Sequence, residues 1–439
     1  MTMLDFANSI VKSLRNAGFE AYFAGGCVRD MILGRAPQDY DISTDALPVD
    51  IQKIFPRTAI VGEAFNVILI ISEHEQQPYT IETATFRKDI GIKDGRHPAR
   101  VEMATAREDV ERRDFTINGM LYDPIADKVL DWVGGQDDLK KKIIRAIGDP
   151  ELRMQEDHLR MLRAIRFASR FSYEIEDHLW KVIQKNSSSI HKISSERIFD
   201  ELTKMLTEGH AAEAFERLCD SGLLGIIMPE ALKMKGVPQP PEYHPEGDVW
   251  IHTMLLLKQL TTAHSKEVAW SCLLHDIGKP PTFEHRPPDR IRFNRHAQIG
   301  REMSEQILKR LKAPTHLREV VCELVDQHLR FADVKKMKPS TLKRFLRNPN
   351  FPLHLEQHRI DCMASHENLD LYSFCHQALA EMPEESLRPK PLLNGDDLIA
   401  MGLQPGPKFK EILEAVETEQ LEGRLSDERA AIQFVKERF

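Results

Sequence analysis

The chain has 439 residues, of which 41% are hydrophobic and 29% charged, and 60 Lys and Arg against 68 Asp and Glu give a net charge of −8. This length predicts about three domains, and the acidic balance argues against non-specific binding of nucleic acid over the whole surface. No apolar run is long enough to span a bilayer, and the N-terminal segment lacks the features of a signal peptide. We therefore expect a cytoplasmic protein with no membrane partner.

The predicted elements change in kind along the chain. Strand patterns such as AYFA, NVILIIS, TIETATF and KVLDWV concentrate before about residue 133, and amphipathic helical patterns dominate after it. The proline-rich segment 235–247 is predicted to be a linker, because proline cannot continue a helix or supply ladder hydrogen bonds. We therefore predict an α+β head at 1–135, a helical neck and body at 136–234, a histidine-rich helical domain at 246–375, and a helical tail at 385–439.

The first motif that carries chemistry is a pair of glycines. Gly25 and Gly26 lie between a predicted strand and a short helix. Paired glycines let backbone N–H groups approach a phosphate, and Arg29 adds positive charge nearby. Such a turn is more often only a turn, so its meaning depends on the neighbouring residues.

Two aspartates lie a short distance further along the chain. In an extended segment Asp39 and Asp41 point to the same face, because side chains alternate with a period of two residues. Two carboxylates that share one cation favour Mg²⁺, which can bridge to substrate phosphates. An isolated pair of this kind is more often a solvated turn, but the glycine pair, Arg29 and the two aspartates together favour a phosphoryl-transfer site.

Further motifs occur in a fixed order. They are RRDFTINGMLYDP at 112–124, GGxxDL at 134–139, EDHLRMLRAIRFASRF at 156–171 and ERIFDEL at 196–202. With these motifs the sequence resembles the polymerase-β-type nucleotidyltransferases, and specifically the class II tRNA nucleotidyltransferases and bacterial poly(A) polymerases, over about residues 1–230. The resemblance implies a head with a small mixed sheet and helices, followed by all-α parts.

The resemblance also implies roles for individual residues. Asp39 and Asp41 are expected to be catalytic and to bind Mg²⁺, and Glu82 fits equally a third carboxylate or an outward-facing strand residue. An Arg fork suits phosphate, and a carboxylate beside an amide can bind sugar hydroxyls. The residues expected to bind the nucleotide are Gly25, Gly26, Arg29, Arg113, Asp114, Asn118, Asp157, Arg160, Arg163 and Arg166.

Base selection is expected at Asp157 and Arg160. The two residues are three apart and are predicted to share one helix face. A carboxylate accepts from the exocyclic amine of cytosine or adenine, and a guanidinium donates to the ring nitrogen beside it. The resemblance implies a protein template that selects CTP and ATP, whereas the alternative is an ordinary surface ion pair. Arg163, Arg166 and Arg170 continue a basic stripe, whose members face the triphosphate or pair with neighbouring carboxylates.

A charged segment at 87–102 resembles the family's flexible loop. In that family the loop is tied to addition of the terminal A, and enzymes that add only CC lack it. The resemblance therefore disfavours CC-only activity, and the alternative is an ordinary charged hairpin.

The histidine-rich part contains LLHDIGKP and resembles the HD-domain metallophosphohydrolases. Lys279 is expected to lie near the substrate phosphate, and His296 and His328 match two further histidines that hold a second metal or the substrate. Imidazole and carboxylate ligands suit Mn²⁺, Ni²⁺ or Mg²⁺, and a metal-bound water can attack phosphate esters. The metal ligands implied by the resemblance are His252, His275, Asp276 and Asp361.

The leading hypothesis is a Mg²⁺-dependent enzyme that adds CCA to the 3′ end of tRNA from CTP and ATP, with a phosphohydrolase acting on RNA-end phosphates. The tail resembles the C-terminal segment of HD-containing tRNA nucleotidyltransferases and is expected to contact tRNA. The alternatives are an enzyme that adds only A, a poly(A) polymerase, or, from a different class, an HD phosphohydrolase with a nucleotide-sensing head. The sequence makes no prediction of the oligomeric state.

Overall fold

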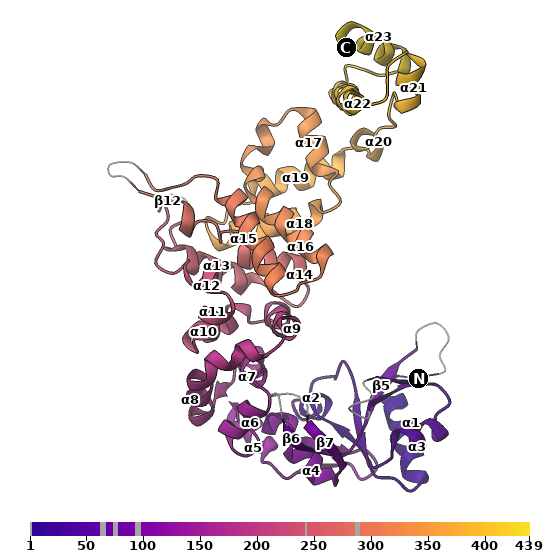
Figure 1. Ribbon diagram of the computed structural model, residues 1–439, viewed down its shortest axis with the longest axis vertical. Helices are drawn as coiled ribbons and strands as arrows, with labels where there is room; N and C mark the ends of the chain where they lie inside the picture. Colours follow the sequence, from indigo (N-terminus) through magenta and orange to yellow (C-terminus); the bar gives the residue numbers. More distant parts are fainter. Residues whose placement is uncertain (1, 62–66, 73–77, 93–97, 242–243, 286–289) are drawn as a thin grey trace. The chain divides into compact units, whose positions relative to one another are not determined.

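The computed structural model describes residues 2–61, 67–72, 78–92, 98–241, 244–285 and 290–439 (Figure 1). The chain forms two compact units, Met1–Pro229 and Glu230–Phe439. The finer division into four parts stays a prediction. Among the described residues, no helix is long and apolar enough to cross a membrane.

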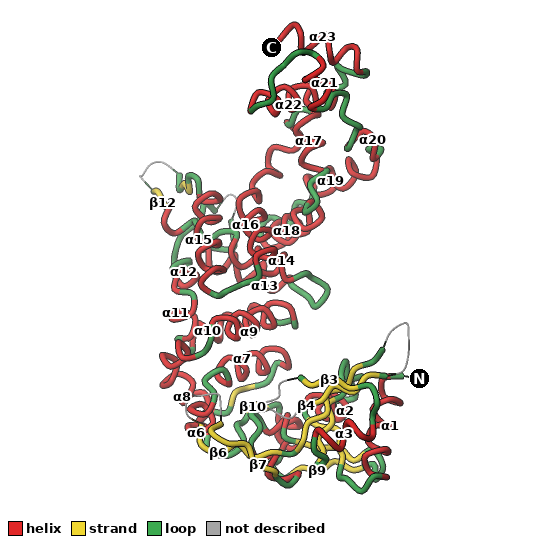
Figure 2. The backbone as a smooth tube through the Cα atoms, turned by 45° about the vertical axis from the view of Figure 1, so that its right-hand side comes forward, coloured by secondary structure: helices red, strands yellow, loops and turns green. Residues whose placement is uncertain are grey.

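A seven-stranded mixed sheet forms the core of the first unit (Figure 2). The strand order is β3-β4-β5-β2-β1-β8-β9, and every neighbouring pair is antiparallel except β2 and β5, which run parallel. The four predicted strand patterns form β1, β4, β5 and β9, so this expectation is confirmed. The strands are β1 Ala21–Ala24, β2 Asp41–Thr44, β3 Thr58–Ile60, β4 Val67–Ile71, β5 Thr80–Thr85, β8 Met120–Asp123 and β9 Lys128–Asp131.

Three helices pack against this sheet. The first, α1 (Met3–Asn16), begins at a capping box in which Thr2 and Asp5 exchange backbone-to-side-chain hydrogen bonds. It buries one apolar face, and it lies beside α3 (Pro48–Ile54) in Figure 1. The short α2 (Gly26–Ile32) contacts β1 and β8, and the glycine pair lies at the end of β1.

A separate hairpin comes after the strands β1–β5. Its strands are β6 (Arg87–Ile92) and β7 (Pro98–Met103), which pair antiparallel. The charged segment 87–102, which resembles the family's flexible loop, therefore forms the two strands of a hairpin. Residues 93–97 between these strands lie outside the described residues. The hairpin leads directly into α4 (Ala106–Glu111).

Helices form the rest of the first unit. The α7 helix carries the arginine stripe, and α9 ends where Gly209 and His210 adopt positive φ angles of 90° and 59°, so that α10 begins as a separate helix. The short strands β10 (Ile143–Ile144) and β11 (Glu174–Ile175) pair in parallel. The helices are α5 Gly135–Lys141, α6 Pro150–Glu156, α7 Arg160–Phe171, α8 Asp177–Asn186, α9 Ser195–Thr207, α10 Ala211–Asp220 and α11 Leu223–Ile227.

The described part of the second unit is mainly helical and includes one small antiparallel pair, β12 (Phe283–Glu284) and β13 (Arg292–Phe293). Trp270 of α14 is fully buried, α14 contacts α13, α16 and α18, and a separate apolar cluster holds the last three helices together. The main helices are α13 Val249–Gln259, α14 Lys266–Leu274, α15 His296–Arg310, α16 Thr315–Gln327, α17 Pro339–Leu346, α18 Phe351–Ala364, α19 Asp370–Glu381, α20 Glu384–Leu387, α21 Gly395–Ala400, α22 Pro407–Leu421 and α23 Glu428–Arg438.

The proline-rich segment 235–247 is more than the linker that the sequence predicts. Pro238 forms a β-bridge with Asp248, and the Asp248 carboxylate accepts a hydrogen bond from the backbone N–H of Gly236 at 2.7 Å. Gln239 is buried and accepts from Lys279 at 2.6 Å. The segment therefore packs on the histidine-rich helices, because its polar side chains find partners there that a sequence pattern does not reveal.

Candidate active sites

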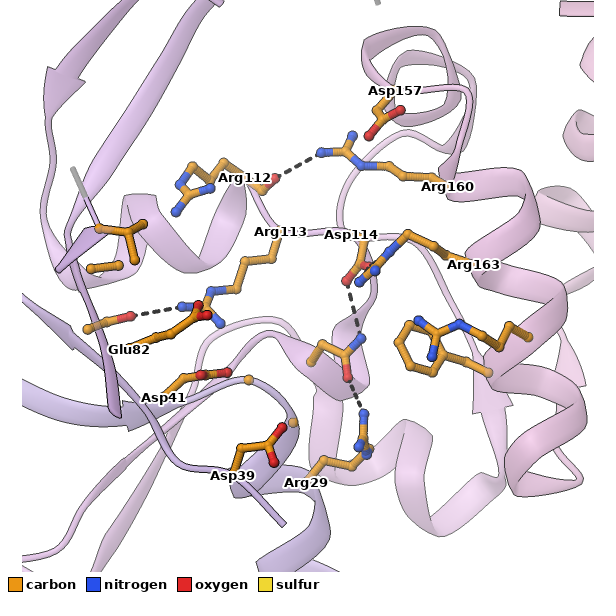
Figure 3. A pocket seen from close by; sticks show the side chains of 18 of the residues that line it. Arg29, Asp39, Asp41, Glu82, Arg112, Arg113, Asp114, Asp157, Arg160 and Arg163 are labelled. Atoms are coloured by element: carbon orange, nitrogen blue, oxygen red, sulfur yellow. Dashed lines mark hydrogen bonds and ion pairs between the residues drawn. The ribbon is translucent and has the colours of Figure 1, made fainter. Parts of the chain in front are cut away.

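A cavity of about 770 Å³ lies beside the central strands of the first unit (Figure 3). It gathers motifs from the turn after β1, from β2 and β5, and from α4 to α7. Three of its polar lining residues, Ser43, Arg112 and Lys204, are not predicted from the sequence, and only Arg112 has a signal there, the arginine doublet. The predicted residues that line it are Gly25, Gly26, Arg29, Asp39, Asp41, Glu82, Arg113, Asp114, Asn118, Asp157, Arg160, Arg163 and Arg166.

Three carboxylates gather at one place in this cavity. Asp41 and Glu82 are direct partners in the parallel β2–β5 register, so their side chains project from the same face. Asp39 lines the cavity two residues earlier, whereas Tyr40 between them is buried with its ring 5.3 Å from that of Phe23. Asp39 and Asp41 therefore line the cavity and the ring of Tyr40 between them does not, as the predicted alternation of side chains requires.

The electrostatics of this cluster suit a cation. Asp41 is exposed to the cavity, and partial desolvation by the cavity walls together with the charges of Glu82 and Asp39 raises the pKa of Asp41 to about 6. A divalent cation between the carboxylates would offset this repulsion, and oxygen ligands are those that Mg²⁺ prefers. The donor set therefore fits a magnesium ion.

Gly25 permits a close approach that other residues would block. Its φ angle is +73°, and a Cβ atom placed there would lie 3.1 Å from Nη1 of Arg113. Its backbone N–H donates to the carbonyl of Met120 on β8 at 3.3 Å. The left-handed conformation favours glycine, so the turn keeps the arginine close to the end of β1.

A buried carboxylate holds two neighbouring arginines of the cavity. Asp109 is 1% exposed and lies 2.6 Å from Nη2 of Arg112 and 3.1 Å from Nη2 of Arg113. The same Arg113 nitrogen donates to Ser43 Oγ at 3.0 Å. Although burial opposes ionisation, the Arg113 and Arg112 charges lower the pKa of Asp109. Both guanidinium groups are therefore fixed before any ligand binds.

A second chain of contacts crosses the cavity and is drawn in Figure 3. Arg29 donates to the Asn118 amide oxygen at 2.7 Å, and the Asn118 amide donates to Asp114 Oδ1 at 3.3 Å. Arg163 contacts Asp114 Oδ2 through Nη2 at 2.6 Å and through Nε at 2.8 Å. Arg29 of α2 and Arg163 of α7 are thus joined through an amide and a carboxylate.

The predicted shared helix face of Asp157 and Arg160 is wrong. Asp157 has an extended conformation, with φ −150° and ψ 103°, and ends α6, whereas Arg160 is the first residue of α7. A different charged residue contacts each of the two side chains. Arg197 Nη2 lies 2.7 Å from Asp157 Oδ2, and Glu156 Oε2 lies 2.5 Å from Arg160 Nη1. Arg160 also donates to the carbonyl of Arg112 at 3.2 Å. A tight turn, not helical periodicity, brings the pair to one cavity.

The rest of the arginine stripe pairs with acidic residues of α9 and its C-terminal end. Arg166 Nε lies 2.7 Å from Glu201, and its Nη1 lies 2.9 Å from Glu208. Arg170 also contacts Glu208, at 3.2 Å. Arg166 still lines the cavity, and Arg170 does not belong to its lining.

The histidine-rich unit gathers the four side chains expected to bind metal. His252 Nε2 lies 3.0 Å from Asp361 Oδ1 and 3.3 Å from His275 Nε2, and His275 Nε2 lies 3.1 Å from Asp276 Oδ2. His252, His275 and Asp276 are all buried. Although burial opposes it, hydrogen bonds with Asp361 and Glu246 raise the pKa of His252 to about 9. Positive charge is favoured here, and a metal cation would supply it.

Two further histidines complete the cluster. The Nε2 atoms of His296 and His328 lie 3.4 Å apart, and they lie 3.6 Å and 3.9 Å from Asp276 Oδ1. Lys279 Nζ lies 2.7 Å from Asp276 Oδ2 and lines the adjoining cavity of about 230 Å³. A Cβ atom at Gly278 would lie 2.1 Å from the carbonyl oxygen of His296, so glycine lets the His-Asp turn pack against α15.

The ring nitrogens facing away from the cluster are also engaged. The Nδ1 atoms of His275, His296 and His328 lie 3.0, 2.8 and 2.7 Å from the backbone carbonyl three residues earlier, and Nδ1 of His252 lies 2.7 Å from Glu246 Oε1. An imidazole that donates from Nδ1 keeps the lone pair of Nε2 for a metal. With buried imidazoles and carboxylates converging, the donor set fits a divalent transition metal.

Three polar residues near this cluster are not predicted as site residues from the sequence. Gln239, His244 and Glu246 lie in the segment predicted as a linker, and His244 lines the cavity. The available signal was the presence of polar and ionisable side chains among the prolines, which a mere spacer does not need.

Three parts of the chain match known families. Residues 21–145 match the Poly A polymerase head domain, and residues 248–359 match the HD domain. Residues 172–234 match a family described as "Probable RNA and SrmB- binding site of polymerase A". Nucleotidyltransferase heads and HD domains generally use divalent metal ions.

Known proteins align with the chain at different lengths. The CCA-adding enzyme of Bacillus subtilis is 30% identical over 427 residues, which cover 97% of this chain and 95% of that enzyme. The CCA-adding enzyme of Lactobacillus helveticus is 39% identical over 218 residues, 49% of this chain, and that alignment spans only 53% of the relative's length.

Solved structures of CCA-adding enzymes also match the fold of this chain. The Bacillus stearothermophilus CCA-adding enzyme in complex with CTP matches 100% of this chain and 98% of its own, with a TM-score of 0.72 and 25% identity. The Thermotoga maritima CCA-adding enzyme complexed with tRNA matches 99% of this chain and 95% of its own, with a TM-score of 0.55 and 19% identity, and this likeness concerns the fold alone. The predicted fold class, a mixed-sheet head followed by helices, is confirmed. The chain therefore belongs to the family of the CCA-adding enzymes.

Proposed function

We propose that this chain adds CCA to the 3′ end of tRNA from CTP and ATP, without a nucleic-acid template. The observation that carries the proposal is a single cavity in which three carboxylates face several fixed arginines and the Asp157/Arg160 pair. Carboxylates for metal, arginines for triphosphate and a donor-acceptor pair for a base are the parts that such a reaction needs.

In this proposal different residues of the cavity bind the metal, the triphosphate and the ribose. Asp39 and Asp41 would hold Mg²⁺, which when bound would supply positive charge where charge builds up on the attacking and leaving oxygens. The arginines at 29, 113 and 163 neutralise and orient the triphosphate through fixed guanidinium groups. Asp114 and Asn118, which lie between two of those arginines, contact the ribose hydroxyls.

The experiment that tests this function offers a tRNA transcript ending at the discriminator base with each labelled nucleotide in turn and in mixtures. A three-nucleotide product of composition C, C and A is expected. A long A tract would instead indicate a poly(A) polymerase. Extension only of a transcript that already ends in CC would indicate an A-adding enzyme, and the absence of any extension would contradict nucleotide transfer by this chain.

Deletion of residues 88–98 is expected to impair A addition and to spare C addition. The hairpin base is tied to the nucleotide cavity, because Arg112 Nε donates to the Arg87 carbonyl at 3.0 Å and Arg87 N–H donates to Asp109 at 3.3 Å. If the hairpin helps the cavity to switch bases, we expect ATP incorporation into a tRNA ending in CC to fall about tenfold or more, equivalent to about 1.4 kcal/mol.

The measurement compares initial rates of CTP incorporation into a tRNA ending at the discriminator base with rates of ATP incorporation into one ending in CC. Lys53→Ala, an exposed change on α3, serves as the control. Equal rates of A addition with and without the hairpin would refute a role in base switching.

A specific observation also favours a second activity. The six clustered His and Asp side chains of the HD domain fit a divalent transition metal such as Mn²⁺ or Ni²⁺, and Lys279 lines the same cavity. We propose that this site hydrolyses phosphate esters at RNA 3′ ends. A 3′ end blocked by a 2′,3′-cyclic phosphate cannot attack a nucleotide. Addition of water that breaks the bond between phosphorus and the 3′ oxygen leaves a 2′-phosphate and a free 3′ hydroxyl, which would prepare the tRNA for the first reaction.

The double variant His275→Ala with Asp276→Ala is expected to lose both bound metal and hydrolysis of 2′,3′-cyclic phosphate ends, while nucleotide addition stays at the wild-type rate. These residues lie at the centre of the cluster, and removal of two ligands leaves no stable coordination. Metal content by elemental analysis and hydrolysis of a cyclic-phosphate RNA provide the readouts. His316→Ala, an exposed histidine of α16, is the control, and metal or activity retained by the double variant would contradict this site.

A further inference from the structure

Glu246 stands behind the histidine cluster and contacts two imidazoles with one oxygen. Its Oε1 lies 2.7 Å from Nδ1 of His252 and 2.9 Å from Nδ1 of His244. The Glu246 side chain is 8% exposed, and His252 is fully buried. This carboxylate lies in the segment between Pro238 and the start of α13, which folds back on the HD domain.

The contact of His252 Nδ1, an ion-pair distance of 2.7 Å to Glu246 Oε1, differs from those of the other cluster histidines. His275, His296 and His328 direct Nδ1 to backbone carbonyls of the preceding turn, and these acceptors are fixed by the main chain. His252 directs Nδ1 to a carboxylate instead. A carboxylate partner orients the ring, fixes its tautomer and increases the basicity of the nitrogen that faces the metal.

The position of His252 makes this support important. His252 lies on α13, whereas its neighbours in the cluster, His275 and Asp361, lie at the end of α14 and on α18. Its Nε2 contacts both His275 Nε2, at 3.3 Å, and Asp361 Oδ1, at 3.0 Å. A rotation of this ring would therefore disturb contacts with side chains from two other helices.

We propose that Glu246 is a positioning residue of the HD site, which fixes the tautomer of His252 with Nε2 toward the metal. The inference rests on the proposed metal-binding function of that site. It also gives the segment around residue 246 a role that its proline-rich sequence does not suggest: the segment carries a polar support of the site and is not only a connection between helices.

The test measures binding of Ni²⁺ alone to metal-stripped, full-length protein by calorimetry. Glu246→Ala is expected to weaken Ni²⁺ affinity about 10- to 100-fold, the usual effect of removing such a partner. Glu246→Gln is expected to weaken it less, because the amide oxygen still accepts from His252 but carries no charge. Thermal unfolding of the metal-free proteins and nucleotide addition report whether each variant is folded.

One control variant separates positioning from general damage. Glu356→Ala removes a different carboxylate that accepts from an imidazole, that of His264 at 2.9 Å, outside the cavity lining, and is expected to have no effect.

The outcomes distinguish this inference from the proposed function. A wild-type protein that binds no Ni²⁺ would overturn both. A wild-type protein that binds Ni²⁺, with Glu246→Ala binding it equally well, would overturn only the role of Glu246, and so would an equal loss in Glu356→Ala. If Glu246→Ala does not fold, Glu246→Gln decides: weaker binding supports the inference, and unchanged binding overturns it.

Discussion

Alanine at Asp41 or Asp39 is expected to lower nucleotide addition by about 10³-fold or more and to leave the HD-domain reactions intact. The two carboxylates line the cavity together with Glu82, and under the proposed function removal of either takes away one of the ligands that would hold Mg²⁺. Metal ions contribute several kcal/mol of transition-state stabilisation, and each 1.36 kcal/mol corresponds to a tenfold change in rate.

The measurement is single-turnover incorporation of ATP into a tRNA ending in CC, at saturating Mg²⁺. Asp50→Ala, a change to an aspartate of α3 that pairs only with its neighbour Lys53 among the ion pairs of the described residues, is the matched control. Hydrolysis by the HD domain provides an internal check of folding. Wild-type rates in Asp39→Ala or Asp41→Ala would remove the carboxylates from the mechanism.

The cluster of Asp39, Asp41 and Glu82 also predicts how the stability of the folded protein depends on pH. The pKa of Asp41 is about 6, above its ordinary value of 3.8, so the folded, metal-free protein binds a proton more tightly than the unfolded chain. Ionisation of Asp41 therefore lowers stability as the pH rises from about 4 to about 6. At pH 7, metal-free Asp41→Asn is expected to unfold at a temperature equal to or above that of the wild type, which calorimetry can measure; a clear decrease would contradict the repulsion.

Short-range patterns explain why much of the first site could be predicted from the sequence. The glycine pair, Arg29 and the two aspartates lie close together along the chain, so a turn followed by an extended segment suffices to place them. Glu82 stayed undecided, because only the β2–β5 register sets it opposite Asp41. Such a register between strands that are about 40 residues apart depends on the whole sheet.

Two other features could not be predicted, for different physical reasons. The spacing of Asp157 and Arg160 fits a helix face, but the chain turns between α6 and α7, and tertiary contacts such as that of Arg197 with Asp157 stabilise this turn. Glu246 lies in a proline-rich segment that has no helical or strand period. Its partner His252 is near in sequence, but the contact depends on how the segment folds back onto α13.

The largest change in specificity is expected at Asp157 and Arg160, the pair proposed to select the base. In the proposed complex the Asp157 carboxylate accepts from the exocyclic amine of cytosine or adenine, and uracil presents a carbonyl oxygen at that position, so two acceptors would face each other without a proton. Sites that hydrogen-bond a ligand's polar groups discriminate strongly, because the wrong ligand leaves buried groups unpaired. Asp157→Asn supplies an N–H donor in place of one oxygen. We expect it to lower the preference for CTP over UTP about 10²-fold.

Arg160→Ala is expected to lower both the rate and the selectivity, because it removes the donor to the ring nitrogen and also the contacts with Glu156 and the Arg112 carbonyl. Competing incorporation of CTP and UTP into a tRNA ending at the discriminator base measures the preference directly. The matched control is Arg170→Ala on the same helix, which loses a contact with Glu208 outside the cavity lining. If Asp157→Asn and Arg160→Ala slow incorporation and leave the CTP preference unchanged, the pair only stabilises the turn between α6 and α7, and base choice must lie with other residues of the cavity.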